Sequence, residues 1–373
     1  MKYTLRSLLA GDKLILRYTE LAMKMELLSL RLVGAGPLKD VTLDFSDGNG
    51  SARPVTLIAG ANGSGKTTVL EAIYNVSATL PTIRLSSTVS SRARTNLAIY
   101  DFIEMTIKID DSIAAFTHGR SRFWRSSDKV DEQSAVPTIP LGFADVTNSS
   151  ALMREHEAPE PVKNFLHRLR TNRIITGATE ANKPISNNRI GLQIPNLLYL
   201  PYLRRLSNAK GDSIVREYTR SPFAYKYDLE VEYVGSLNSY LVWLDYAEPK
   251  MFIESAQFIE NIYDNKKHIE IDRRRLKAIV RTDNDETHDI EYLSSGEQNL
   301  LIILLELQRR LTPHSIVLID EIENSLHPKY QYKLGQMLKT LQQRTPFQLV
   351  ATTHAPAFLD IFGAENTLIL TDF

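Results

Sequence analysis

A glycine-rich loop between an apolar run and a stretch with helical spacing constrains the fold of this chain more than any other feature. Residues 60–67 read GANGSGKT, a full match to G-x-x-x-x-G-K-[ST], and they follow the apolar run 55–59. The N–H groups of such a loop and the positive end of the next helix attract phosphate groups. We expect Lys66 to reach the β- and γ-phosphates of a nucleoside triphosphate and the Thr67 hydroxyl to bind Mg²⁺. The loop residues expected to bind the nucleotide are Gly60, Asn62, Gly63, Ser64, Gly65, Lys66, Thr67 and Thr68.

Two further apolar runs end in the polar residues that phosphate chemistry needs. Ile316–Ile319 runs directly into Asp320 and Glu321, and residues 347–351 end shortly before His354. The carboxyl ends of buried parallel strands are where open α/β sheets bind ligands. Asp320 is therefore placed to hold Mg²⁺, Glu321 to polarise an attacking water, and the His354 imidazole to hydrogen-bond a γ-phosphate. Two solvated acids at the end of a surface strand are the alternative interpretation.

A Ser-Ser-Gly turn precedes the most apolar predicted helix. The segment 292–310 reads YLSSGEQNLLIILLELQRR. A turn of this kind at a helix start presents free N–H groups to an anion. Residues 294–297 are therefore a second candidate contact for phosphate.

Composition limits the remaining chemistry. The chain has 373 residues, a formal net charge of zero and no cysteine. This excludes disulfides, zinc–thiolate sites, iron–sulfur clusters and cysteine catalysis, and it suits a cytoplasmic protein. We expect no membrane association, because no apolar run approaches the roughly 20 residues of a membrane span. Residues 1–24 lack a clean apolar segment, so we interpret them as an N-terminal extension and not as a signal peptide.

Five segments, taken in chain order, resemble the motifs of the ABC superfamily of ATPases. Gly60–Thr67 looks like a Walker A loop, Leu293–Gln298 resembles the signature L-S-G-G-Q, and Ile316–Glu321 resembles Walker B with its catalytic glutamate. Ser325–Pro328 occupies the D-loop position, and His354 that of the switch histidine. The wording of these segments is similar to the AAA-15/AAA-21 group. That group includes the overcoming-lysogenization-defect proteins and ATPase subunits of Gabija-, Septu-, retron- and PARIS-type anti-phage systems.

The resemblance implies a fold and a domain organisation. The expected class is α/β, an ABC-type P-loop ATPase head with a mixed core sheet flanked by helices, an antiparallel β-subdomain and an inserted, mainly helical lid. The predicted units are the extension 1–24, the first half of the head 25–145, the lid 146–285 and the second half of the head 286–373. Residues 102–119 alternate like strands of the antiparallel sheet. Residues 151–173 and 233–264 look helical and belong to the lid.

The resemblance also implies a mechanism. Such ATPases bind two ATP molecules, each with Mg²⁺, between two head-to-tail subunits. Lys66 of one subunit and Ser294 of the other would clamp the same ATP, with Ser295, Gly296 and Glu297 completing the signature contact. The catalytic residues would be Glu321, His354 and Lys66, and the metal ligands Thr67 and Asp320. Turnover would be slow and switch-like. A homodimer or a higher homo-oligomer is expected.

One segment departs from the pattern of the group. Residues 197–205, LLYLPYLRR, resemble a stretch that usually reads Tyr-Ile-Pro-Ala-Glu-Arg. Here Tyr202 and Leu203 replace Ala-Glu, so no role is transferred to Arg204.

The sequence leaves two functions to weigh in full. Because no nuclease motif is visible before the chain ends at Phe373, we expect a sensor and scaffold that controls a separately encoded nuclease or toxin in anti-phage defence. The alternative is a RecF- or SMC-like ATPase that grips DNA. Three basic clusters leave nucleic acid open as a ligand, although a solvated face or a partner interface is the favoured interpretation: 120–125, 167–173 and 273–277. A transporter subunit fits poorly, because the segment between loop and signature is long.

Overall fold

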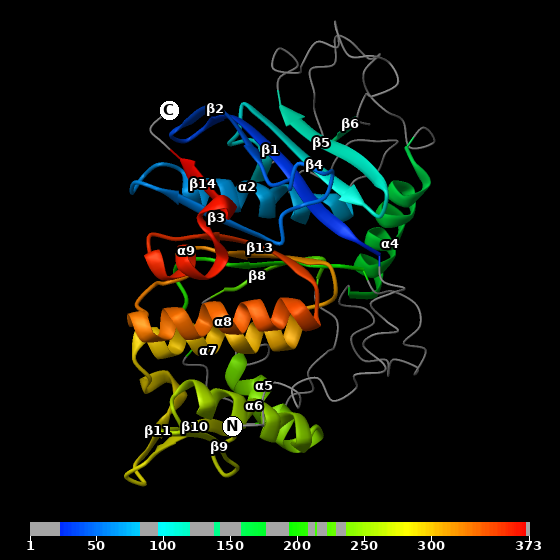
Figure 1. The fold of residues 1–373 in the computed structure, drawn as a ribbon. Coiled ribbons are helices and arrows are strands. Elements are labelled where there is room, and N and C mark those ends of the chain that lie inside the picture. The colour runs from blue at the N-terminus through cyan, green and yellow to red at the C-terminus, as the bar shows by residue number, and fades with distance from the viewer. Residues whose placement is uncertain are drawn as a thin grey trace, which may run out of the picture.

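The computed structural model describes residues 23–82, 96–119, 138–141, 158–176, 194–207, 213–214, 222–228 and 236–370. Within them the chain forms three sheets and the helices that cover them (Figure 1). The predicted extension 1–24 lies almost entirely outside these residues, as do the basic cluster 120–125 and most of the start of the predicted lid. Over the described residues, no helix combines the length and apolar character that crossing a membrane requires.

A six-stranded sheet forms the centre of the molecule. Its order is β14-β3-β13-β12-β7-β8, and every neighbouring pair is parallel. The strands are β3 (Val55–Gly60), β7 (Leu197–Leu200), β8 (Ala224–Lys226), β12 (Ser315–Ile319), β13 (Phe347–Thr352) and β14 (Thr367–Leu370). Ile319 pairs with Ala351, and Thr352 pairs with Ile58. The carboxyl ends of β3, β12 and β13 therefore meet at one edge, as the sequence predicted.

The continuous apolar runs of these strands follow from burial on both faces of the sheet. Alternate residues such as Ile58, Leu318 and Val350 belong to a core shared with β1, β4 and α2 (Lys66–Thr79). Their neighbours, such as Leu57 and Val317, belong to a second core shared with α7 (Ser295–Arg310). The sheet thus separates the helix of the glycine-rich loop from the helix of the signature segment (Figure 1).

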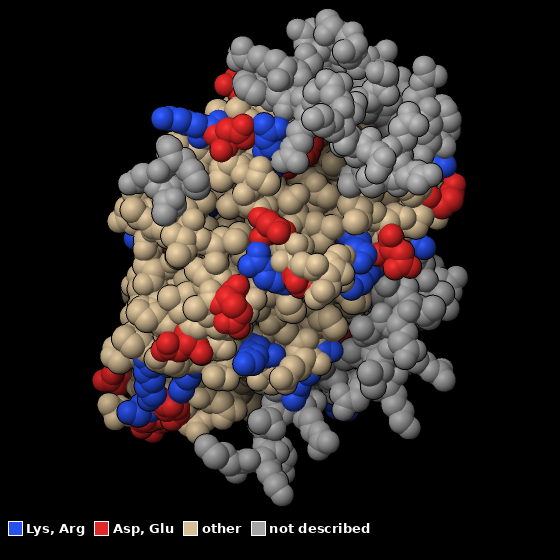
Figure 2. Space-filling model, turned by 45° about the horizontal axis from the view of Figure 1, so that its top comes forward, with Lys and Arg blue, Asp and Glu red and all other residues tan. Residues whose placement is uncertain are grey.

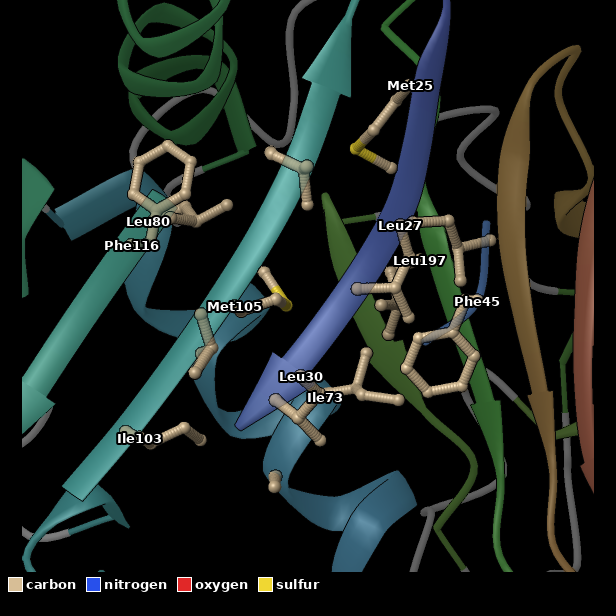
Figure 3. Close-up of a cluster of buried hydrophobic side chains, with 14 of the residues drawn as sticks. Met25, Leu27, Leu30, Phe45, Ile73, Leu80, Ile103, Met105, Phe116 and Leu197 are labelled. Carbon is tan, nitrogen blue, oxygen red and sulfur yellow. The ribbon is translucent and has the colours of Figure 1, made fainter. Parts of the chain in front are cut away.

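A five-stranded sheet covers α2 on the side away from the central sheet (Figure 1). Its order is β2-β1-β4-β5-β6, antiparallel except for the parallel pair β5 and β6. The strands are β1 (Met25–Ala35), β2 (Leu38–Asp44), β4 (Phe102–Ile109), β5 (Ser112–Gly119) and β6 (Thr138–Pro140). Figure 3 shows Leu30, Met105 and Phe116 of this sheet facing the same apolar layer as Ile73 of α2 and Leu197 of β7. The α/β class and the antiparallel subdomain are thus confirmed.

Helices and a small sheet lie on the opposite side of the central sheet (Figure 1). They are α7, α8 (Pro328–Arg344), α9 (Pro356–Phe362), α5 (Leu237–Ala247), α6 (Pro249–Ile262) and the antiparallel strands β9 (Lys267–Asp272), β10 (Lys277–Thr282) and β11 (Thr287–Asp289). Another helix, α4 (Glu160–Thr176), packs near β4 and β5. Short 3₁₀ turns occupy Leu80–Thr82, Ile290–Tyr292 and Ala364–Asn366.

The segment predicted as a lid, 146–285, contains more than helices. The helical prediction for 233–264 is confirmed by α5 and α6. However, β7 and β8 lie in the central sheet, and β9 and β10 form two strands of the small sheet. The buried run Leu197–Leu200 is four residues long, too short to be distinguished from a helix segment by periodicity. Its position in the sheet depends on pairing with β12, more than 100 residues away along the chain.

Candidate nucleotide-binding site

The glycine-rich loop joins β3 to α2 as predicted, and two of its glycines have backbone angles that favour glycine. Gly63 has φ of 81° and Gly65 of 95°, both in the left-handed region. Gly65 also lacks room for a Cβ atom, which would meet the side chain of Leu38 in β2 at 2.8 Å. Gly60 is confined in the same way between β14 and the Ser64 hydroxyl. The spacing of the motif therefore reflects both backbone conformation and close packing.

Two buried groups of the loop are suited to a phosphate ligand. Lys66 is buried, and its Nζ donates to the carbonyl oxygens of Gly60 at 2.9 Å and Ala61 at 2.8 Å. The Ser64 Oγ is buried and has no hydrogen-bond partner within the described part of the chain. A buried hydroxyl without a partner is costly unless a ligand supplies one. Asn62 and Gly63, which lie within the same loop, are exposed.

The predicted metal ligands meet directly. The Thr67 hydroxyl donates to Asp320 Oδ2 at 2.8 Å, although the two residues are 253 positions apart. Asp320 is fully buried, and its other oxygen accepts a hydrogen bond from the Thr352 hydroxyl at 2.6 Å. Hydroxyl and carboxylate oxygens suit Mg²⁺, which often binds through one carboxylate and the substrate phosphates. The site therefore fits this ion, although no group of three acidic or histidine side chains gathers within the described residues.

Glu321 follows Asp320 in a strained backbone conformation. Its φ of 44° is unusual for a residue with a side chain, and its side chain is half-buried. The Glu321 N–H donates to the Thr352 hydroxyl at 2.7 Å. Thr352 thus contacts both acidic residues, yet the sequence analysis assigned it no role. Its position at the end of β13, just before the predicted switch histidine, was the available signal.

The segment around His354 is held by an acid that the sequence analysis also missed. Glu323 accepts hydrogen bonds from the Thr353 hydroxyl at 2.7 Å and from the His354 N–H at 2.6 Å. The His354 side chain is exposed. Glu323 therefore fixes the backbone of the switch segment and leaves the imidazole free to face a ligand.

The signature residues lie at the start of α7, across the central sheet from α2. Ser294 caps the helix: its hydroxyl donates to Glu297 Oε2 at 2.8 Å, and the Glu297 N–H donates back to it at 3.4 Å. Ser294 and Ser295 are exposed. A Cβ atom on Gly296 would overlap the Ser325 carbonyl oxygen, so this glycine permits close contact with the predicted D-loop. The structure does not bring these serines to the loop of their own chain.

Residues at the end of α6 and in β9 hold the signature segment from the other side. Glu297 Oε1 pairs with Lys267 Nζ of β9 at 2.6 Å, and the Tyr263 hydroxyl donates to the Glu297 carbonyl at 2.9 Å. Burial works to raise the pKa of Glu297, but the hydrogen bonds from Lys267 and Ser294 outweigh it and lower that pKa. Glu297 is therefore held in its charged form.

Arg204, to which no role was assigned from the sequence, lies against the backbone of the two acidic residues that follow β12. It is 5% exposed, and its guanidinium contacts the backbone carbonyls of Asp320 and Glu321. Burial lowers its pKa to about 10, so it stays charged at neutral pH.

Parts of the chain are similar to curated proteins. A retron Ec83 probable ATPase from Escherichia coli is 32% identical over 115 residues, which are 28% of this chain and 20% of that protein. The Septu protein PtuA from Bacillus thuringiensis is 31% identical over 104 residues, 24% of this chain and 25% of that protein. The matched segments thus span a quarter or less of these relatives.

A solved structure and a family model match much more of the chain. The SMC head domain from Thermotoga maritima aligns with 90% of this chain and 92% of that one, at 12% identity and a TM-score of 0.37. The model of the family described as "AAA domain, putative AbiEii toxin, Type IV TA system" matches residues 55–360, from the strand before the glycine-rich loop to the helix after His354. Because this match covers most of the chain, the protein belongs to that AAA-domain family.

Proposed function

We propose that this chain binds and hydrolyses ATP as a dimer and serves as the sensor and scaffold subunit of a prokaryotic anti-phage defence system. The observation that carries the proposal is the direct bond between Thr67 of the loop and Asp320 of β12. It joins the predicted phosphate-binding and metal-binding elements in one site. Relatives named as a retron ATPase and a Septu protein support the placement in defence.

Each residue of the site has a distinct task in this proposal. Lys66 would leave the carbonyls of its own loop and bind the β- and γ-phosphates, and Ser64 would gain a phosphate partner. Thr67 and Asp320 would hold Mg²⁺, which neutralises charge on the phosphate oxygens. Glu321 would accept a proton from the attacking water. His354, held by Glu323 through its backbone, would hydrogen-bond the γ-phosphate.

A second copy of the chain would complete the site. Ser294 and Ser295 are exposed at the start of α7, which lies across the central sheet from α2, the helix that Lys66 begins (Figure 1). In a head-to-tail dimer they would reach the ATP on the partner's loop. ATP would then join the subunits, and hydrolysis would loosen them at a slow rate. We further propose that a separately encoded nuclease or toxin binds this dimer and is controlled by it.

The mass of the protein in solution tests the dimer. Light scattering without nucleotide should give the 42.3 kDa of the chain, and Mg-ATP should give twice that mass. A mass that stays at one chain in saturating Mg-ATP would contradict the head-to-tail model. A tagged protein purified from its native host in Mg-ATP should retain the effector at a fixed ratio.

DNA clamping is the alternative function, and the charges of the described residues give it little support. In the cluster 273–277, Arg273 pairs with Asp245 at 2.9 Å, Arg275 with Asp289 at 2.7 Å, and Lys277 with the same Asp289 at 2.9 Å. The face in Figure 2 likewise carries blue and red groups side by side. DNA-stimulated hydrolysis with salt-sensitive DNA binding would nevertheless establish this function in place of the first.

Lys267 provides a test of the signature contact. We expect Lys267→Met to weaken ATP-dependent dimerisation roughly tenfold, because Glu297 would then face the partner's triphosphate without its cation. Glu297→Gln added to the same chain should restore dimerisation, since glutamine keeps the helix cap and removes the charge. Sedimentation at several Mg-ATP concentrations measures both effects. If the Lys267–Glu297 pair only holds β9 against α7, the double variant will dimerise with ATP as weakly as Lys267→Met alone.

A further inference from the structure

We infer that Arg204 is a positioning residue that holds the peptide of Glu321 and connects it to the signature helix, so that the two half-sites on one subunit act together. This inference rests on the proposed ATP-dependent dimer, in which one subunit offers Glu321 to one ATP and Ser294 to the other.

The guanidinium of Arg204 lies at the point where three segments meet. Its Nη1 donates to the carbonyl oxygens of Leu200 at 3.1 Å, Pro201 at 2.6 Å and Asp320 at 2.6 Å. Its Nη2 donates to the Glu321 carbonyl at 2.9 Å. Four backbone carbonyls from β7 and β12 thus surround one buried cation. A planar fork of donors suits this arrangement, whereas the single ammonium of lysine could satisfy only part of it.

These bonds act on a residue of the site that has an unusual backbone conformation. Glu321 has φ of 44°, and such a conformation persists only where surrounding contacts enforce it. Arg204 binds its carbonyl oxygen, and the Thr352 hydroxyl accepts its N–H. The backbone of the proposed base is therefore held on both sides. Arg204, which follows β7, binds its carbonyl, and Thr352, at the end of β13, binds its N–H.

The same arginine reaches the signature helix through Asn299. Arg204 Nε donates to Asn299 Oδ1 at 2.6 Å, and Asn299 Nδ2 donates to the Asn324 carbonyl at 2.7 Å. Asn324 Nδ2 in turn donates to the Tyr202 carbonyl at 2.7 Å, two residues before Arg204. Asn299 is buried and lies one helical turn after Ser295. A shift of α7 would therefore displace the Glu321 backbone through Arg204, and the start of the predicted D-loop through Asn324.

Asn299→Leu removes this connection and keeps the branched shape of the side chain. Since the Walker-type loop is untouched, we expect the affinity of the monomer for a fluorescent ATP analogue to stay within about twofold of wild type. The kcat should fall about tenfold or more, and the Hill coefficient for ATP should drop from about 2 towards 1. Gln308→Leu is the matched control on the same helix, because within the described residues its side chain bonds to Ser255 of α6 at 2.6 Å and not to Arg204. This control should keep the wild-type kcat and Hill coefficient.

Arg204→Lys tests the other end of the connection and should lower kcat while leaving ATP binding in place. If this variant fails to fold, Asn299→Leu still decides. A wild-type kcat and Hill coefficient in folded Asn299→Leu would overturn the inference, as would an equal loss of affinity and kcat, which marks a merely structural role. A wild-type protein that neither dimerises nor hydrolyses ATP would instead overturn the proposed function, and the inference with it.

Discussion

Glu321→Gln will bind ATP and Mg²⁺ normally but hydrolyse ATP roughly 100- to 10,000-fold more slowly, which is the usual contribution of a general base. Glutamine keeps the shape of the side chain but cannot accept the proton of the attacking water. The contacts that fix residue 321 are backbone contacts, from Arg204 to its carbonyl and from its N–H to Thr352, so they survive the substitution. The variant should therefore accumulate as an ATP-bound dimer.

Release of phosphate and light scattering in Mg-ATP measure these two effects on one sample. Glu323→Gln is the matched variant, because Glu323 lies two residues away but contacts the Thr353 hydroxyl and the His354 N–H. It should slow hydrolysis less than Glu321→Gln, since an amide oxygen can still accept one of those bonds. Normal turnover in Glu321→Gln together with a large loss in Glu323→Gln would move the base to Glu323.

The elements that carry this site could be predicted from the sequence because their signals are local. The apolar runs at 55–59, 316–319 and 347–351 are bounded by turn or polar residues, and buried parallel strands require such runs. The loop pattern fixes a strand before it and a helix after it. Chain order then places the strand ends at one edge, and the bond between Thr67 and Asp320 confirms that they meet.

The residues that were missed act through contacts that are distant along the chain. Thr352 reaches Asp320 across 32 positions, and Arg204 reaches the Asp320 carbonyl across 116. A threonine at a strand end has no pattern of its own, and the stretch that contains Arg204 departs from the pattern of the group at Tyr202 and Leu203. The position of Arg204 depends on β7, whose four buried residues gave too short a signal to separate it from the predicted helical lid. Pairing with β12 makes this segment a strand, which its local sequence preference alone did not indicate.

Removing the charge of Lys66 should have the second large effect, a loss of ATP binding. We expect Lys66→Ala to weaken ATP binding roughly 100-fold, as expected for the loss of hydrogen bonds between charged groups. The fold should tolerate the change, because alanine removes a buried charge whose partners within the described residues are the carbonyls of Gly60 and Ala61. Thermal unfolding with and without Mg-ATP shows the result, since a ligand that binds the folded state raises the melting temperature by an amount that grows with the logarithm of its concentration relative to its Kd. Lys108→Ala is the control: Lys108 also donates to a loop carbonyl, that of Gly50 at 2.8 Å, but this bond is exposed and lies outside the site. An ATP-induced shift that persists in Lys66→Ala and disappears in Lys108→Ala would place the nucleotide elsewhere in the molecule.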